Sequence, residues 1–363
     1  MPALGSLLLG TLLAAAAPGL GGCARLGPST LETERGNYNI AVQRTNDEQL
    51  LLNLVRLKYR DTPLFLEVTS VASQYTLTGN ANANATLESG AAGIFGLGAG
   101  ASMAEKPTVT YSPLQGDKFI RRVLSPVPLK NISLLYHSGW SVDRIFRLCF
   151  QRLNALKNAP GASGPTPSVA PDYEDFQKAV RIVRLLQTKD AMDLLYAEPD
   201  GVPALVLEIA PEAVDWPETK ALASLLGIAP GKNRYFLLSG PVSSQDQQIR
   251  MQPRSLLGIL FYLSQAVEAP PRDVELGRVT RTIYPNGDPF DWTRMTGDLL
   301  RIASSAQPVE HAAVQVRYRG TWFYIDDTHL DSKSTFSLLA QLFSLQAGEV
   351  KGDGPVLTLP LGD

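Results

Sequence analysis

Residues 75–111, YTLTGNANANATLESGAAGIFGLGAGASMAEKPTVTY, decide the fold of this chain more than any other stretch. Apolar or small residues hold the odd positions from Tyr75 to Leu87, and Thr, Asn or Glu holds each even position through Glu88. Alternation with a period of two is typical of a β-strand with one polar face. This strand would span roughly 46 Å, whereas strands of globular domains are mostly about 3–10 residues long.

The second half of the stretch can return as an antiparallel strand. With the turn centred near Gly93, Tyr75 faces Tyr111, and like residues oppose each other along both faces, as a stable register requires. The pattern therefore predicts a long Ala/Gly/Asn-rich β-hairpin with Ile94 and Phe95 exposed at its tip.

Such a hairpin needs partners, because a lone two-stranded ribbon is marginal in water and its edges are open. Copies from neighbouring subunits could close a ring or pore in the outer membrane, with the Asn ladder in water and the apolar positions toward lipid. A hairpin packed on the protein's own body or on a partner, and a mobile Gly/Ala loop, remain alternatives. The residues expected to contact the membrane or other subunits are Tyr75, Leu77, Ala83, Ala85, Leu87, Ile94, Phe95, Leu97, Met103 and Tyr111.

The first 22 residues predict a secretory signal. Residues 4–17, LGSLLLGTLLAAAA, form an uncharged apolar run that is too short to span a bilayer as a helix. Leu20-Gly21-Gly22-Cys23 follows and resembles a bacterial lipobox, which implies cleavage before Cys23 and a diacylglycerol on its thiol. Ala24, where inner-membrane lipoproteins commonly carry Asp, implies the periplasmic side of the outer membrane as the destination.

Composition excludes several classes of protein. The chain has 363 residues, is 44% hydrophobic and carries 33 Lys and Arg against 35 Asp and Glu, so it can bury a large core and has no basic excess for nucleic acid. Two Cys and three His argue against a disulfide framework or a metal centre. The glycine pattern over 96–101 meets Pro107 and a strand where a dinucleotide fold needs a helix. No cofactor is expected.

The spacing of apolar residues predicts an α+β fold. We expect a helix over 46–59 that begins at an Asn46 capping box, a separate strand over 63–71, and a helix that buries Cys149. The Pro/Gly/Ser-rich residues 158–171 are typical of an exposed linker. The expected organisation is a signal peptide over 1–22, an N-terminal helical region with the hairpin over 23–157, that linker, and a C-terminal α+β domain over 172–363.

One acidic cluster is a candidate for chemistry. Asp326, Asp327 and His329 lie between an expected strand and an expected helix, where two carboxylates and an imidazole could bind a metal or act as an acid/base pair. The competing interpretation is a turn followed by a helix cap at Asp331. The leading function is a non-enzymatic structural or interaction subunit of an outer-membrane assembly. The alternative is a periplasmic ligand-binding or hydrolytic domain that uses this cluster.

Three phrases resemble those of uncharacterised lipoproteins from Gram-negative bacteria. They are EQLLLNLVRLKYRDTPLFLEV at 48–68, PTVTYSPLQGDKF at 107–119 and GTWFYIDD at 320–327. The resemblance implies a lipid anchor and a location in the cell envelope. The expected partner, a homo-oligomer or another envelope protein, follows instead from the open edges of the hairpin. It brings no substrate and no catalytic residue.

Overall fold

A computed structural model of the chain describes residues 26–86, 94–240, 247–347 and 357–360. The chain divides into two compact units, Met1–Glu48 and Gln49–Asp363. Helix α2 (Leu26–Lys58) continues through this division. The predicted helix start at Asn46 is wrong, because Asn46 is an exposed residue inside a helix that is already formed.

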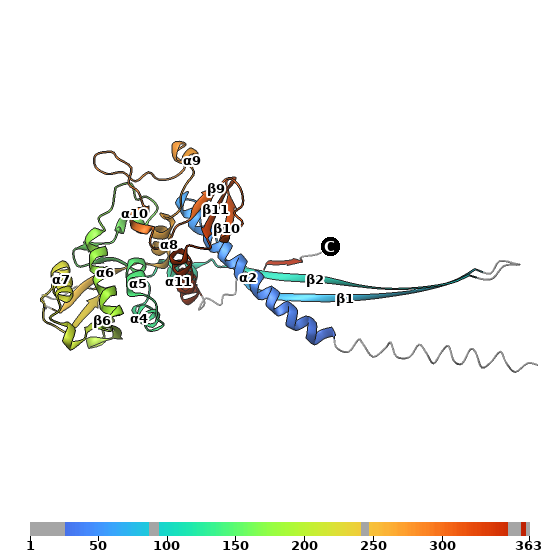
Figure 1. Cartoon of the computed structure of the whole chain (residues 1–363), viewed down its shortest axis with the longest axis horizontal. Helices are drawn as coiled ribbons and strands as arrows, with labels where there is room; N and C mark the ends of the chain where they lie inside the picture. The colour runs from blue at the N-terminus through green and yellow to red at the C-terminus, as the bar shows by residue number, and fades with distance from the viewer. Residues whose placement is uncertain (1–25, 87–93, 241–246, 348–356, 361–363) are drawn as a thin grey trace, which may run out of the picture. The chain divides into compact units, whose positions relative to one another are not determined.

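The second unit has an α+β fold, as the sequence predicts, and its largest element is a mixed sheet of six strands (Figure 1). The strand order is β4-β3-β8-β7-β6-β5. The β7–β8 pair is parallel and the other pairs are antiparallel. The strands are β3 (Phe150–Leu153), β4 (Leu156–Lys157), β5 (Met192–Ala197), β6 (Ala204–Ile209), β7 (Arg234–Leu238) and β8 (Gln248–Pro253).

Besides the six-stranded sheet, the second unit contains helices and a second sheet of three strands. The sheet has the order β10-β11-β9, with β9 (Ala303–Ser305), β10 (Ala312–Tyr318) and β11 (Thr321–Asp326). The helices are α3 (Asp117–Leu124), α4 (Leu129–His137), α5 (Val142–Cys149), α6 (Glu174–Thr188), α7 (Pro217–Leu226), α8 (Leu256–Ser264), α9 (Pro271–Glu275), α10 (Thr293–Thr296) and α11 (Leu330–Ala347). These bounds match the apolar periodicity of the sequence, since each longer helix buries one face.

The expected exposed linker at 158–171 is exposed only in part, because its first residues enter the core. Asn158, Ala159 and Ala162 are buried. Strand β3, which precedes this stretch and pairs with β4, also pairs with β8, which follows it. The two expected domains therefore share one sheet. Pro and Gly predict a turn here, and the turn passes through the interior because Asn158 Nδ2 donates to the carbonyls of Arg147 and Phe150.

Arg254 organises this interior. Its side chain is fully buried, and its guanidinium donates to the carbonyl oxygens of Arg147, Leu148, Phe150 and Asn158 and to Ser163 Oγ. These acceptors lie on α5, β3 and the following turn, so one side chain ties the three together. Burial lowers its pKa to about 10, and no carboxylate is among these acceptors.

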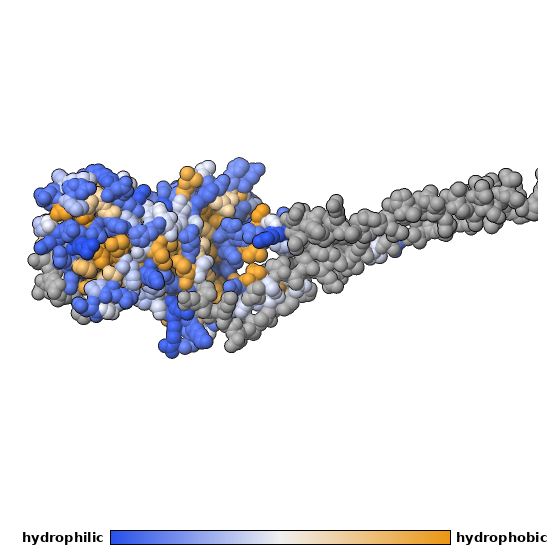
Figure 2. Space-filling view, turned by 90° about the horizontal axis from the view of Figure 1, so that it is seen from below, coloured by the Kyte–Doolittle hydropathy of each residue, from blue (hydrophilic) through white to orange (hydrophobic). Residues whose placement is uncertain are grey.

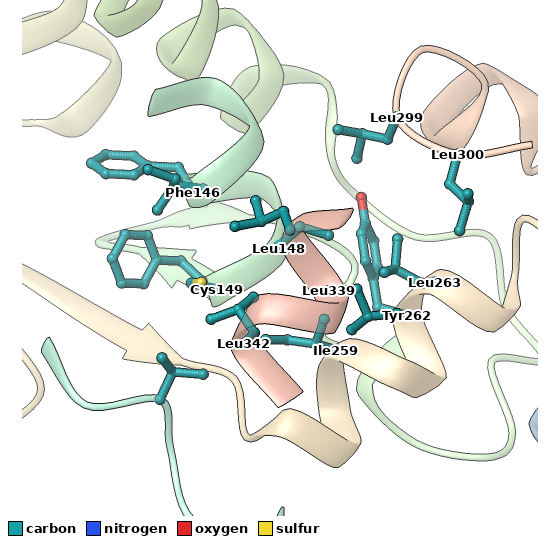
Figure 3. Close-up of a cluster of buried hydrophobic side chains, with 14 of the residues drawn as sticks. Phe146, Leu148, Cys149, Ile259, Tyr262, Leu263, Leu299, Leu300, Leu339 and Leu342 are labelled. Atoms are coloured by element: carbon teal, nitrogen blue, oxygen red, sulfur yellow. The ribbon is translucent and has the colours of Figure 1, made fainter. Parts of the chain in front are cut away.

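The apolar core beside Arg254 collects side chains from α5, α8, α11 and the segment at 299–300 (Figure 3). The Arg254 guanidinium lies 4.2 Å from the centre of the Tyr262 ring. Cys149 is fully buried, which confirms it as a core residue, and burial raises the pKa of its thiol to about 12.

The third sheet is a long ribbon. Strand β1 (Leu66–Thr86) pairs antiparallel with β2 (Ile94–Pro113), and β12 (Leu357–Pro360) adds to β2 at its base (Figure 1). The ladder from Leu66 to Thr86 corresponds to about 66 Å of strand. The predicted strand at 63–71 is confirmed from Leu66 onward, but it is not separate from the hairpin, because it is the first part of β1.

The predicted register of the ribbon is also wrong. Tyr75 pairs with Glu105 instead of Tyr111, and Ala83 pairs with Leu97 instead of Met103. The numbers of paired residues add to 180 above a bulge at Val68–Ser70, so the centre of symmetry is Gly90 instead of Gly93. The register is fixed at the base, where Gln49 holds Leu66 opposite Pro113 and β12 pairs with β2. Because the sum of the paired residue numbers differs from the predicted sum by an even number, every residue stays on its predicted face.

Candidate interaction surface

The base of the ribbon is clamped by two amide side chains of α2. Gln49 donates from Nε2 to the Leu66 carbonyl at 2.9 Å and accepts from the Leu66 N–H at 2.6 Å. Asn53 does the same for Leu64, at 2.8 and 2.9 Å. Gln49 and Asn53 are four residues apart, so they lie on one face of α2. Together they bond to the backbone groups of Leu66 and Leu64 as a neighbouring strand would. The first outward backbone groups of the ribbon are thereby satisfied.

A second cluster holds the loop between α2 and β1. Tyr59 donates from its hydroxyl to Asp273 Oδ2 at 2.6 Å, and Arg278 donates to the same carboxylate at 2.7 Å. Asp61 accepts from Arg319 at 2.9 Å and from the Tyr318 hydroxyl. The hydrogen bond from Tyr59 lowers the pKa of Asp273, with Arg278 adding to the effect. The cluster ties the end of α2 to α9 and to the β10–β11 hairpin.

The hydrogen-bonding direction of each ribbon residue follows from one bond at the base. The Leu114 N–H donates to the Phe65 carbonyl at 2.9 Å, so residue 114 faces β1. The side to which a residue directs its N–H and C=O groups alternates along a strand, and the bulge adds its extra residue to β1 only. Even residues of β2 therefore bond to β1, and odd residues direct their N–H and C=O groups to the outer edge. Above the bulge, the odd residues of β1 likewise face outward.

The outer edge of β2 is divided at Pro107. Below this residue, Val109 and Tyr111 are odd and are paired with Leu359 and Leu357 of β12. Pro107 is also odd, so its missing N–H falls on the outer edge, which is where a strand tolerates proline. Above Pro107, β2 continues to Ile94 with no described strand on its outer side.

The outer edge of β1 is open and unprotected. β1 is a terminal strand of its sheet, so within the described residues no strand pairs with the edge from Val71 to Ala85. Soluble proteins block such edges with Lys, Pro or covering segments. β1 carries Glu67 below the bulge and no Lys, Arg, Asp or Pro. Thr78, Asn80, Gly100 and Ser102 are exposed.

In the described part of the ribbon, charged residues lie only toward the base. Glu105 and Lys106 pair with Tyr75 and Gln74, and above them the eleven pairs from Thr76–Ala104 to Thr86–Ile94 contain no charged residue. On the odd face the pairs combine Ala, Gly, Leu, Met and Phe, while β1 supplies only Thr and Asn to the even face.

The predicted contact residues divide into three groups. Tyr111 lies at the base, opposite both Val68 and Leu357. Ile94 and Phe95 belong to the ladder, opposite Thr86 and Ala85, and the prediction that they form the tip is wrong. Tyr75, Leu77, Ala83, Ala85, Leu97 and Met103 lie on the odd positions of the ladder, whereas Leu87 and Cys23 fall outside the described residues.

The acidic cluster at the end of β11 is engaged in local bonds. Asp326 Oδ1 accepts from the N–H and the hydroxyl of Thr328 at 2.8 and 2.6 Å, and these bonds lower the pKa of Asp326. Asp327 pairs with Lys333. The His329 ring caps α11 by accepting from the Ser332 N–H at 3.2 Å. Among the described residues, no group of three or more His, Cys, Asp or Glu could hold a metal ion.

Asp331 does not play the predicted role of a helix cap. It lies inside the first turn of α11, where its carboxylate pairs with Arg144 at 2.8 Å. The cluster as a whole therefore builds the turn between β11 and α11, and each of its carboxylates already has a hydrogen-bond donor.

Two surface hollows offer little to a ligand. One, of about 460 Å³, lies at the start of α6, where Asp172 pairs with Lys157 and Asp175 with Lys178, each at 2.8 Å. The other, of about 660 Å³, is a shallow groove between α4 and α11 that Leu134 and Leu345 line. On the face shown in Figure 2, hydrophilic residues separate the apolar residues of this unit into several groups.

Comparison of the chain with protein-family models, curated proteins and solved structures found no match. Within the described residues, none of the helices combines the length and apolar character that crossing a bilayer requires.

Sequence reasoning missed the residues that position the ribbon. Gln49 and Asn53 border and interrupt the apolar stretch of α2 at 50–57, and their spacing of four residues places both on one face of the helix. Arg254 follows a strand and precedes the apolar α8, so its charge alone favoured the surface. No local pattern could have shown that its acceptors come from residues more than 90 positions away.

Proposed function

We propose that this protein is a lipid-anchored, non-enzymatic subunit of an outer-membrane assembly. Copies join through their ribbons, with the outer edge of β1 in one copy paired to the outer edge of β2 in the next. Repetition of this contact closes a ring or pore. The observation that carries the proposal is the β1 edge from Val71 to Ala85, which has no partner strand among the described residues and contains no charged residue and no Pro.

The two ribbon edges are complementary and belong to different strands. Pairing β1 with β2 is antiparallel, as in the ribbon itself, and uses outward residues on both sides. This contact joins two different surfaces, so it propagates from copy to copy and ends only when the ring closes. A β1–β1 contact would leave both β2 edges open above Pro107.

The charge-free part of the ribbon fits a bilayer. Its eleven residue pairs correspond to about 36 Å of strand, and a tilt of 35–45° reduces this to about 26–30 Å, close to the apolar band of membrane-spanning strands. The odd face then meets lipid, and the Asn and Thr face meets water. In hydrocarbon each open N–H or C=O group costs several kcal/mol, so the bilayer itself enforces edge pairing.

The lipid on Cys23 completes the proposal. Acyl chains contribute about 0.8 kcal/mol per buried CH₂, so two or more chains hold the subunit at the membrane before its ribbons assemble. Anchored subunits are confined to a surface, which raises their effective concentration for edge pairing.

The test is the particle size of the lipoprotein extracted from membranes in mild detergent. The wild-type chain should sediment as a closed oligomer. Replacing residues 79–101 with a two-residue Asn-Gly turn keeps Thr78 opposite Ser102 and removes the upper part of both edges, so this variant should sediment as a single subunit. Asn80→Ser, which leaves both edges intact, is the matched control and should remain oligomeric.

Thermal unfolding of the shortened variant shows whether its core has stayed folded. A wild-type protein that sediments as one subunit would contradict the proposal. An oligomer of unchanged size after the replacement would contradict it as well, because the contact would then lie outside the ribbon.

A further inference from the structure

We infer that neighbouring ribbons in this ring are staggered by two residues. A β2 residue then faces, in the next subunit, the β1 residue whose number makes the sum 178 or 182, whereas within one ribbon the sum is 180. The inference rests on the proposed ring and specifies its subunit contact. It makes Ser102 of one copy the neighbour of Asn80 or Thr76 in the next, and not of Thr78.

The stagger must be an even number. Odd residues of both strands face outward, so the hydrogen-bonded pairs between subunits join odd residues to odd residues. An odd stagger would set outward groups of one strand against inward groups of the other and would place Asn beside Ala on the same face. The permitted values are therefore zero, two, four and higher even numbers.

Ring closure selects a stagger of two residues from these values. Copies related by a rotation stand at the same height, so the stagger per subunit fixes the tilt of the strands. With a rise of about 3.3 Å per residue and two strand spacings of about 4.8 Å per subunit, staggers of zero, two and four give tilts of about 0°, 35° and 54°. Closed sheets have tilts of about 35–45°, which a stagger of two approaches most closely.

The base of β2 sets the lower end of this contact. β12 occupies the outer edge opposite Thr108 to Tyr111, and Pro107 offers no N–H to a neighbouring strand. The next subunit can therefore pair with β2 from Lys106 up to Ile94. Ser102 lies within that span and is exposed, as are Thr78 and Asn80 of β1.

The test uses single-cysteine variants that are mixed in the membrane. One copy carries Ser102→Cys, and a second copy, with a tag of different size, carries Thr76→Cys, Thr78→Cys, Asn80→Cys or Gly79→Cys. Even residues face each other between subunits as non-hydrogen-bonded pairs about 4.5 Å apart at Cα, a distance that a disulfide accepts. Cys149 is fully buried, so it does not compete.

After mild oxidation, the expected result is a covalent band at the summed mass of the two tagged chains for Asn80→Cys or for Thr76→Cys. Thr78→Cys reports a stagger of zero, and Gly79→Cys lies on the opposite face, so both should stay at the mass of single chains. A dominant crosslink to Thr78→Cys or Gly79→Cys, or no crosslink in a particle that sediments as an oligomer, would overturn the inference. Sedimentation as one subunit would instead overturn the proposed ring.

Discussion

The core around Arg254 and the β1–β2 ribbon differ in whether their polar groups have hydrogen-bond partners within the chain. In the core, even a buried cation has five hydrogen-bond acceptors, all supplied by the same chain. In the ribbon, the outer edge of β1 from Val71 to Ala85 has no described partner strand. One part of the fold therefore satisfies its own polar groups, whereas the other leaves a backbone edge without a partner strand among the described residues.

The largest expected effect tests the self-sufficiency of the core. Arg254→Met should lower the free energy of unfolding by about 3–5 kcal/mol, because the carbonyls of Arg147, Phe150 and Asn158 lose their donor in the interior. Urea unfolding followed by fluorescence measures the change. Arg317→Ala, at an exposed position, is the control and should stay within about 0.5 kcal/mol of wild type. Equal effects of the two variants would show that the stability of the core does not depend on the hydrogen bonds of Arg254.

The next prediction compares the two faces of the ribbon. Ala81→Arg places a charge on the odd face near the middle of the charge-free span and should cost about 2–4 kcal/mol of insertion if that face meets lipid. Asn82→Arg, one residue away on the even face, is the matched control and should be tolerated. The measurement is the fraction of extracted protein that sediments as an oligomer. Equal losses in both variants would mean that the two faces meet the same solvent.

A smaller effect is expected at the junction of the two regions. Asn53→Leu removes both bonds to Leu64 while it keeps the side-chain volume, so the free energy of unfolding should fall by about 2–3 kcal/mol. The Leu64 amide should exchange its hydrogen faster than in wild type. Asn39→Leu, on an exposed part of the same helix, is the control. Unchanged exchange at Leu64 would show that the clamp does not hold the ribbon.

The Asp273 cluster predicts that the stability of the protein depends modestly on pH in the acidic range. Its folded-state pKa is lowered by the Tyr59 hydrogen bond, so its stabilisation is present above the unfolded pKa of about 3.9 and is lost as the pH falls through the folded value. Asp273→Asn should therefore be less stable than wild type at pH 7 and lose less stability between about pH 5 and pH 2. Glu212→Gln, at an exposed residue, should keep the wild-type pH profile. Parallel curves for Asp273→Asn and wild type would contradict this assignment.

The smallest expected effect concerns the acidic turn. Asp326→Ala removes the two bonds from Thr328 and should lower the Tm only slightly, because the carboxylate is exposed to solvent. Zn²⁺ or Mn²⁺ should leave the Tm of the full chain unchanged in wild type and variant alike, since the carboxylates are already engaged. A rise in Tm with metal that disappears in Asp326→Ala would favour the ligand-binding or hydrolytic alternative.

Local pattern was sufficient for elements that bury one face. The α5 helix around Cys149 and the β10–β11 hairpin follow their apolar periodicity, because a face that must be buried fixes both the period and the type of the element. Pattern was insufficient at 158–171. Pro and Gly there predict a turn, but whether a turn lies at the surface depends on acceptors and donors that come from distant residues.

The sequence by itself determined that residues 75–86 alternate in polarity and therefore form a strand with two unlike faces, since side chains of a strand alternate whatever its partner. Only the tertiary structure decided the register and the open edge. Ala, Gly and Asn at successive positions permit several pairings of similar energy, whereas Gln49, Asn53 and β12 fix where the ribbon starts and which outward groups are already bonded.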